Sequence, residues 1–239
     1  MNQLQRKLAP LSLLACALLL GACSSDDEDD MTMMPEPEPE PVNVSYEVTI
    51  TNLTYGQPLS PIAVVLHDDG HLWTVGSMAS NELELLAEGG DNSAVIGLPM
   101  VSASVSGAAP LAPGGSDTLT VTIEDKTDAM LSLATMLVNT NDAFTGLDAI
   151  DLSNLVVGDA WSGEAGVYDA GTEANSEAAG TIPGPADGGT GFDMARDDVD
   201  FVAMHAGVVS MDDGLTTSVL TQAHRFDNPV LYVMIKRTE

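Results

Sequence analysis

The chain has 239 residues and a formal net charge of −29, because its 36 Asp and Glu residues outnumber 7 Lys and Arg. A surface this acidic repels phosphate backbones and anionic headgroups, which argues against nucleic acid and anionic membrane surfaces as partners. Two explanations of the charge stay open at this point: solubility in a salty external medium, and binding of divalent cations.

The N-terminus has the pattern of an export signal. Two basic residues precede an apolar stretch over 8–20, which is too short for a membrane-spanning helix. The stretch runs into the tetrapeptide LGAC at 20–23, which resembles the lipobox of bacterial lipoproteins. This resemblance implies a signal peptide over 1–22 and acylation of Cys23, the mature N-terminus. The alternative is an ordinary signal peptide that is cut nearby, with Cys23 incidental.

The residue after Cys23 bears on the location of the protein. It is Ser24 and not Asp, which resembles the outer-membrane sorting pattern of Gram-negative lipoproteins. We therefore expect an exported protein held in the outer membrane by its acyl chains, on the periplasmic or the outer face. Cys16 leaves with the signal peptide, so no disulfide is expected. Loss of Arg6 and Lys7 leaves five basic against 36 acidic residues, a net charge of −31.

The segment 23–43 is expected to be a disordered tether. It begins with an acidic run over 26–30 and continues with alternating Pro and Glu over 35–41. Like charges repel, proline favours an extended chain, and neither piece has apolar side chains to bury. The tether would hold the folded domain away from the membrane.

The rest of the chain, 44–239, is long enough for one domain with a sizeable core. Period-two alternation or β-rich apolar runs predict strands over 46–53, 61–67, 116–124, 130–139 and 229–236. The strand over 229–236 is expected to be central in its sheet. Helix formers followed by a Gly pair predict a helix over 77–88, and a weaker pattern predicts one over 199–209.

This arrangement of elements predicts a mainly β fold, an antiparallel β-sandwich with a few short helices and long loops. The polar stretch 158–198 is long for a loop in a compact domain. A bound cation is one way to organise a loop of this length.

Several segments, in order and spacing, resemble the spondin N-terminal (F-spondin) domain in its bacterial form. They are VTITNLT at 48–54, QPLSP at 57–61, GSMAS at 76–80, LAEGG at 86–90, LSLATMLVNTNDAFTGL at 131–147 and YDAGTE at 168–173. The resemblance covers about 45–237 and implies a C2-like β-sandwich with a calcium site in its loops.

In the animal members of that family, one Asp of an SPDW-like turn and two Asp of a YDAGTD turn bind calcium. The resemblance places these ligands at Asp142, Asp169 and Glu173. Two departures change the site: Ala143 and Phe144 displace the aromatic residue, and Glu173 replaces the final Asp. The longer arm of Glu alters the coordination geometry, so no affinity is carried over.

The residues themselves favour the same site more weakly. Calcium takes six to eight oxygen ligands, and carboxylates are its preferred side chains. Asp142 follows an apolar strand, and Gly171 lets the chain fold back between Asp169 and Glu173. Three carboxylates on two loops would form a cation cage, whereas the alternative is that all three are solvated acids.

The remaining candidate motifs do not favour a second metal site or a catalytic site. The segment 197–200 (DDVD) lacks the Gly and closing Glu of an EF-hand loop. It is expected to begin a helix, and a second cation site at Asp197, Asp198 and Asp200 is the alternative. His67 is expected to be a structural hydrogen-bonding residue, and the four His show no metal-site spacing. With no free Cys and no GxSxG motif, no enzymatic activity is expected.

Together these features predict an outer-membrane-anchored, calcium-binding lipoprotein that acts as a surface binding or adhesion module for a glycan or protein ligand. Two alternatives remain: a structural envelope lipoprotein without a specific partner, and a secreted hydrolase.

Overall fold

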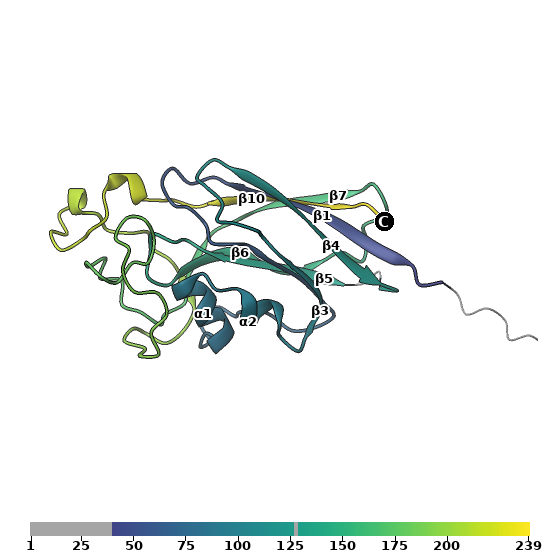
Figure 1. The fold of residues 1–239 in the computed structure, drawn as a ribbon, viewed down its shortest axis with the longest axis horizontal. Coiled ribbons are helices and arrows are strands. Elements are labelled where there is room, and N and C mark those ends of the chain that lie inside the picture. The colour runs from purple at the N-terminus through teal and green to yellow at the C-terminus, as the bar shows by residue number, and fades with distance from the viewer. Residues whose placement is uncertain (1–39, 127–128) are drawn as a thin grey trace, which may run out of the picture. The chain divides into compact units, whose positions relative to one another are not determined.

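The computed structural model describes residues 40–126 and 129–239 (Figure 1). The expected signal peptide, Cys23 and the tether up to residue 39 lie outside the described residues. Glu40–Glu239 is one compact unit. No helix among the described residues is long and apolar enough to cross a membrane.

One sheet has four antiparallel strands in the order β4-β1-β10-β7. Their bounds are Asn43–Asn52 (β1), Ser116–Glu124 (β4), Ala160–Ala165 (β7) and Leu231–Arg237 (β10). The strand β10 pairs with both β1 and β7, which confirms that the C-terminal apolar run is a central strand. On the outer face of β1 and β4, the hydroxyls of Thr49 and Thr118 hydrogen-bond at 3.0 Å.

The second sheet has six antiparallel strands in the order β3-β2-β5-β6-β8-β9. Their bounds are Ala63–His67 (β2), Val101–Ser106 (β3), Met130–Met136 (β5), Ala143–Asp151 (β6), Val167–Asp169 (β8) and Ala203–Met204 (β9). The strands β2 and β5 are buried on both faces, which explains why they read as continuous apolar runs and not as alternating ones.

The two sheets pack face to face around the main core. Alternate residues of β1, β4 and β10 meet residues of β2 and β5 there, including Val48, Val121, Ile235, Leu66 and Leu133. This arrangement confirms a mainly β fold of two antiparallel sheets, consistent with a β-sandwich. A second apolar cluster lies on the other face of the six-stranded sheet, beneath the helical segment 81–96, which packs on β2, β3, β5 and β6.

Two short helices cover this outer face, α1 (Asn81–Gly89) and α2 (Ser93–Ile96). The helix α1 begins later than the sequence predicts because Ser80 caps it: the Ser80 hydroxyl accepts the Leu83 N–H at 3.2 Å. It ends at the predicted glycine pair, with Gly90 in the left-handed conformation.

The predicted helix over 199–209 is wrong, and so is the helix start expected at 197–200. Val202 forms backbone hydrogen bonds with Gly76 and Ser77, and these bonds hold the segment before β9 in a non-helical conformation. Only two 3₁₀ turns follow among the described residues, Met211–Asp213 and Gln222–His224.

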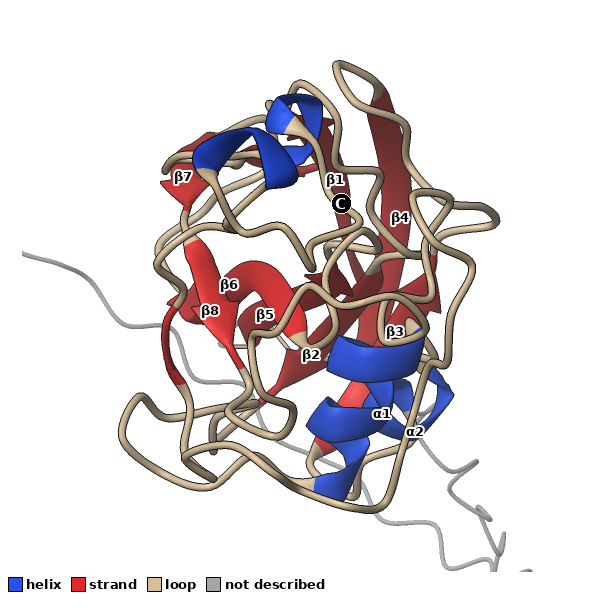
Figure 2. Ribbon diagram, turned by 90° about the vertical axis from the view of Figure 1, so that its left-hand side faces the viewer, coloured by secondary structure: helices blue, strands red, loops and turns tan. Residues whose placement is uncertain are grey.

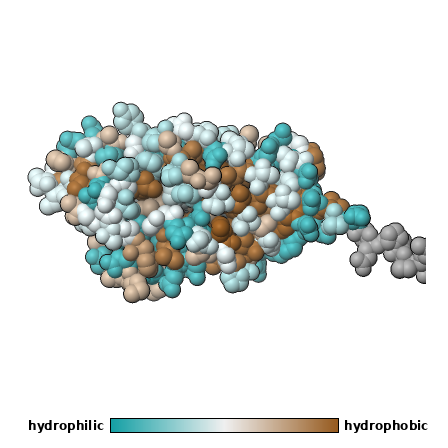
Figure 3. Space-filling model, in the orientation of Figure 1, coloured by the Kyte–Doolittle hydropathy of each residue, from teal (hydrophilic) through white to brown (hydrophobic). Residues whose placement is uncertain are grey.

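Long loops gather at one end of the sandwich (Figures 1 and 2). The segment 170–202 contains no helix or strand, although β7 and β8 occupy part of the stretch that the sequence predicts as loop. The strand β1 begins at the opposite end, so the chain enters the domain far from these loops (Figure 1). On the face drawn in Figure 3, hydrophobic side chains reach the surface near its middle, between hydrophilic ones.

Candidate metal centre

The structure brings the three predicted ligand residues together at the loop end. Asp142 is the last residue of the turn between β5 and β6, and Asp169 is the last residue of β8. Ala143, the first residue of β6, pairs with Asp169 in the sheet, so Asp142 lies next to the end of β8. Glu173 follows in the next turn, and its backbone N–H reaches the Asp142 carboxylate.

Asp142 is completely buried, and only one of its two carboxylate oxygens accepts hydrogen bonds. Its Oδ2 accepts the backbone N–H groups of Thr172 at 2.9 Å and Glu173 at 3.1 Å. Its Oδ1 is buried and has no hydrogen-bond partner among the described residues. A buried carboxylate oxygen without a partner is unfavourable, and a cation, a proton or a water molecule can satisfy it.

The chain fold between Asp169 and Glu173 depends on Gly171. Its φ is +72°, and a Cβ there would lie 2.3 Å from the Phe201 carbonyl oxygen. Asp169 accepts the Gly171 N–H at 2.7 Å and the Asn175 side-chain amide at 2.6 Å. Both Asp169 oxygens are therefore engaged within the loop, and the turn that the sequence predicts from Gly171 is present.

The local electrostatics favour protonation or cation binding. Burial and the neighbouring Asp169 charge raise the pKa of Asp142 to about 7. Burial, with the carboxylates of Glu88 and Asp142 next in effect, raises the pKa of Glu173 to about 8. A bound cation would act in the opposite direction, because a nearby positive charge stabilises the carboxylate form.

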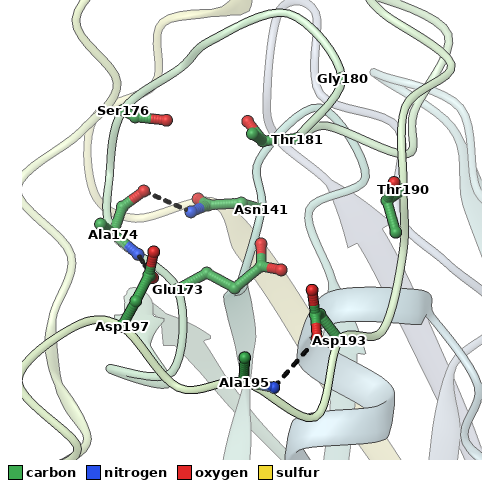
Figure 4. Close-up of a pocket in the computed structure, with 10 residues that line it drawn as sticks. All are labelled: Asn141, Glu173, Ala174, Ser176, Gly180, Thr181, Thr190, Asp193, Ala195 and Asp197. Carbon is green, nitrogen blue, oxygen red and sulfur yellow. Dashed lines mark hydrogen bonds between the residues drawn. The ribbon is translucent and has the colours of Figure 1, made fainter.

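Glu173 projects into a cavity of about 270 Å³ between the loops. Figure 4 shows its carboxylate in the middle of this cavity, with Asp193 and Asp197 on the surrounding loop and Asn141 opposite. Asn141 is anchored by a hydrogen bond from its side-chain amide to the Ala174 carbonyl oxygen at 2.9 Å. The cavity thus offers carboxylate and amide oxygens, the ligand type that calcium prefers.

Other buried groups without partners surround the predicted ligands. Glu88 and Glu177 each bury one carboxylate oxygen without a hydrogen-bond partner among the described residues, and His205 buries Nε2 in the same way. Besides the effect of burial, the negative charge of Asp169 acts to raise the pKa values of Glu177 and His205, and that of Glu88 acts to raise the pKa of Glu173. Polar groups that are incompletely satisfied are therefore concentrated at this end of the domain.

Four acidic residues of this site are not predicted from the sequence: Glu88, Asp193, Asp197 and Glu177. Glu88 lies in the LAEGG segment of the family resemblance, which is the only signal that could have indicated it. The sequence predicts Asp197 at a helix start, but its carboxylate accepts the Ala174 N–H at 2.9 Å. His67 is buried as expected and hydrogen-bonds to the Ser132 hydroxyl and the Asp69 carbonyl, both at 2.8 Å.

The donor chemistry fits a hard divalent cation, but the ligands are not preassembled into a cage. Within 40–126 and 129–239, no three His, Cys, Asp or Glu side chains lie close enough together to hold a metal ion. The fit rests on the unpartnered Asp142 Oδ1 and on the concentration of carboxylates around it. Calcium binding at Asp142, Asp169 and Glu173 remains a prediction.

Comparison with known proteins does not assign the chain to a family. No protein-family model matches it, and no curated protein matches its sequence significantly. The resemblance to the spondin N-terminal domain therefore also remains a prediction.

Proposed function

We propose that the protein is an exported lipoprotein, anchored in the outer membrane through Cys23, whose β-sandwich binds calcium at its loop end and acts as a surface binding or adhesion module. The observation that carries the cation site is Asp142, a fully buried carboxylate whose Oδ1 lacks a partner among the described residues. Asp169 and Glu173, the other two expected ligands, adjoin it.

Asp142, Asp169 and Glu173 would hold the ion, with Asn141 near enough to Glu173 to share its cavity. Bound calcium would supply positive charge that offsets the repulsion among these carboxylates. The backbone N–H groups of Thr172 and Glu173 orient Asp142 by fixing Oδ2. The Asn175 amide orients Asp169 in the same manner.

The architecture supports a surface role for the loop end. The described chain begins beside β1, at the end of the sandwich opposite the long loops (Figure 1). The chain therefore enters the folded domain at the end away from those loops. Loops on a rigid β scaffold are a common location for binding residues.

Thermal unfolding of the fragment 40–239 tests the cation site. Millimolar calcium should raise the unfolding midpoint and a chelator should lower it, because an ion that binds only the folded state adds about 2.7 kcal/mol at a hundredfold excess over Kd. Magnesium should substitute poorly, since it requires a smaller octahedral site. Asp169→Asn should remove most of the calcium shift.

The control is Asp69→Asn, which removes the same charge from an exposed residue after β2. This variant should keep the full calcium shift. Equal stabilisation by magnesium and calcium that persists in Asp169→Asn would mean diffuse screening of a highly acidic protein and would refute a specific site. Capture of surface glycans or proteins with and without chelator tests the adhesion role separately.

A further inference from the structure

A second cleft is lined by residues of both sheets, from β6 and β8 of the six-stranded sheet and from β7 of the four-stranded sheet. The chain 160–169 changes sheets there: β7 belongs to the four-stranded sheet and β8 to the six-stranded sheet, with Gly166 between them. The strand β8 pairs with β6 only along Ala143–Thr145, so the remainder of β6 borders an open space. This cleft has a volume of about 480 Å³.

One wall of the cleft is aromatic. Trp73 and Tyr168 line it, and Phe144 packs behind them. The ring centroids lie 5.2 Å apart for Trp73–Phe144, 5.2 Å for Trp73–Tyr168 and 5.4 Å for Phe144–Tyr168. Because each ring contacts the other two, this wall is held in place before any ligand binds.

The facing groups are polar and rigidly positioned. The Asp148 carboxylate accepts the Leu72 N–H at 2.8 Å and the Ser132 hydroxyl at 3.1 Å through Oδ1, and its Oδ2 lies 2.6 Å from His71 Nδ1. The Asp148 side chain is only 15% exposed, whereas that of His71 is 62% exposed. With Nδ1 turned toward Asp148, the Nε2 of His71 is left for a ligand.

The charge of the cleft is negative. Glu164 of β7 contributes a second carboxylate to its lining, and no Lys or Arg is among the lining residues. Glu164 is exposed and forms no ion pair within the described part of the chain. Aromatic faces beside carboxylates attract a cation, through the ring quadrupole and through direct ion pairing.

We infer that this cleft binds a sugar that carries a free amino group. The ammonium would pair with the exposed Glu164 carboxylate, and the more buried Asp148 would add negative charge. The ring would pack on the partly exposed Tyr168 and on the small exposed part of Trp73, which is 8% exposed. The hydroxyls would meet His71 Nε2 and the carboxylate oxygens. An acidic sugar would be repelled by both carboxylates, and a single ammonium on an alkyl chain would leave most of the cleft unfilled.

This inference rests on the surface-binding role proposed above, to which it adds a ligand class, but it does not depend on calcium. The residues that line the cleft do not include Asp142, Asp169 or Glu173. The two sites therefore have different ligand residues, although Tyr168 of the cleft is next to Asp169 on β8.

The test is titration of the full-length protein in detergent with four probes: the disaccharide of glucosamine, its N-acetylated counterpart, glucuronate, and an Nα-acetylated lysine amide. Fluorescence in a Trp161→Phe background reports on Trp73, since these are the two Trp of the chain. The glucosamine disaccharide should bind about tenfold more tightly than the N-acetylated sugar, because acetylation removes the charge.

Glu164→Gln should weaken binding of the glucosamine disaccharide about tenfold. The matched control is Glu124→Gln, which changes another exposed Glu, on β4, the opposite edge strand of the same sheet. This variant should bind like the parent protein. Excess chelator should leave this binding unchanged, so a failure of the calcium proposal would not be mistaken for a failure of the cleft.

Equal affinity for the charged and acetylated sugars, or an unchanged affinity in Glu164→Gln, would overturn the assignment. Binding of the lysine amide as tight as that of the amino sugar would also overturn it, because the cleft would then recognise an ammonium group without recognising a sugar.

Discussion

Arg196 and Glu84 form a two-point ion pair across 112 residues of sequence, with Nε 3.0 Å from Oε1 and Nη2 2.5 Å from Oε2. Their side chains are 18% and 5% exposed. Arg196 also binds Asp200 at 2.7 Å and the Ala79 carbonyl oxygen at 3.0 Å. One guanidinium thereby fastens the long loop to the start of α1, on the side where Asp193 and Asp197 border the Glu173 cavity.

Replacing Arg196 by Met should destabilise the domain by about 3 kcal/mol, because it leaves Glu84 buried without its partner. Urea unfolding of the fragment 40–239 measures the change. The control is Arg225→Met, since the Arg225–Asp213 pair is 50% and 31% exposed and should contribute little. Similar losses in both variants would show that Arg196 is an ordinary surface residue.

Gly171→Ala should destabilise the domain and also reduce the stabilisation by calcium. The added Cβ would collide with the Phe201 carbonyl oxygen and require a left-handed backbone for Ala. Gly188→Ala separates these effects, because Gly188 has a φ of +70° and a Cβ added there would meet nothing within 4 Å. It should lose only about 1–2 kcal/mol and keep the calcium response. Thermal unfolding with calcium and with chelator tests both variants, and equal losses would contradict the steric argument.

Without calcium, the stability of the domain should fall as the pH rises from about 4 to above 8. Asp142 and Glu173 have folded-state pKa values of about 7 and about 8, above their ordinary values of 3.8 and 4.5. The folded state therefore binds more protons than the unfolded state in this window. The stability they contribute is complete below the ordinary values and is lost as the pH passes the folded ones.

Unfolding midpoints at pH 5.5 and above pH 8, in chelator, measure this slope. Glu173→Gln should flatten it, and millimolar calcium should offset it most at the higher pH, where the carboxylates are ionised. Stability that increased through this range in chelator would contradict the assigned burial of the two carboxyl groups.

Cys23→Ser tests the anchor. The variant should be left unprocessed or released in soluble form, because Cys23 is the residue expected to carry the acyl chains. Fractionation of cells followed by detection of the protein measures its location. Association with the outer membrane at the parent level would refute the lipid anchor.

The strands could be predicted because their signal is local. Alternation along 116–124 gives β4 with the same bounds, and the β-rich run at 229–236 becomes the central strand β10. The strand β7 is not predicted because its sequence, AWSGEA, contains few β-forming residues. As an edge strand, β7 pairs with only one neighbour, so its sequence needs less β propensity than that of a central strand. The helix expected over 199–209 failed because pairing of Val202 with residues 76 and 77 overrides a weak local preference.

The sequence by itself determined which residues can form strands. Its resemblance to the spondin N-terminal domain implied that Asp142, Asp169 and Glu173 belong together, and the glycine between Asp169 and Glu173 supported this more weakly. Only the tertiary structure decided what surrounds them. Glu88 comes from α1, and Asp193 and Asp197 come from a loop about a hundred residues later. The cleft between Trp73, Asp148 and Glu164 likewise arises where the chain passes from β7 in one sheet to β8 in the other. Such neighbours are set by packing and strand pairing between distant segments, which leave no periodicity in the sequence to read.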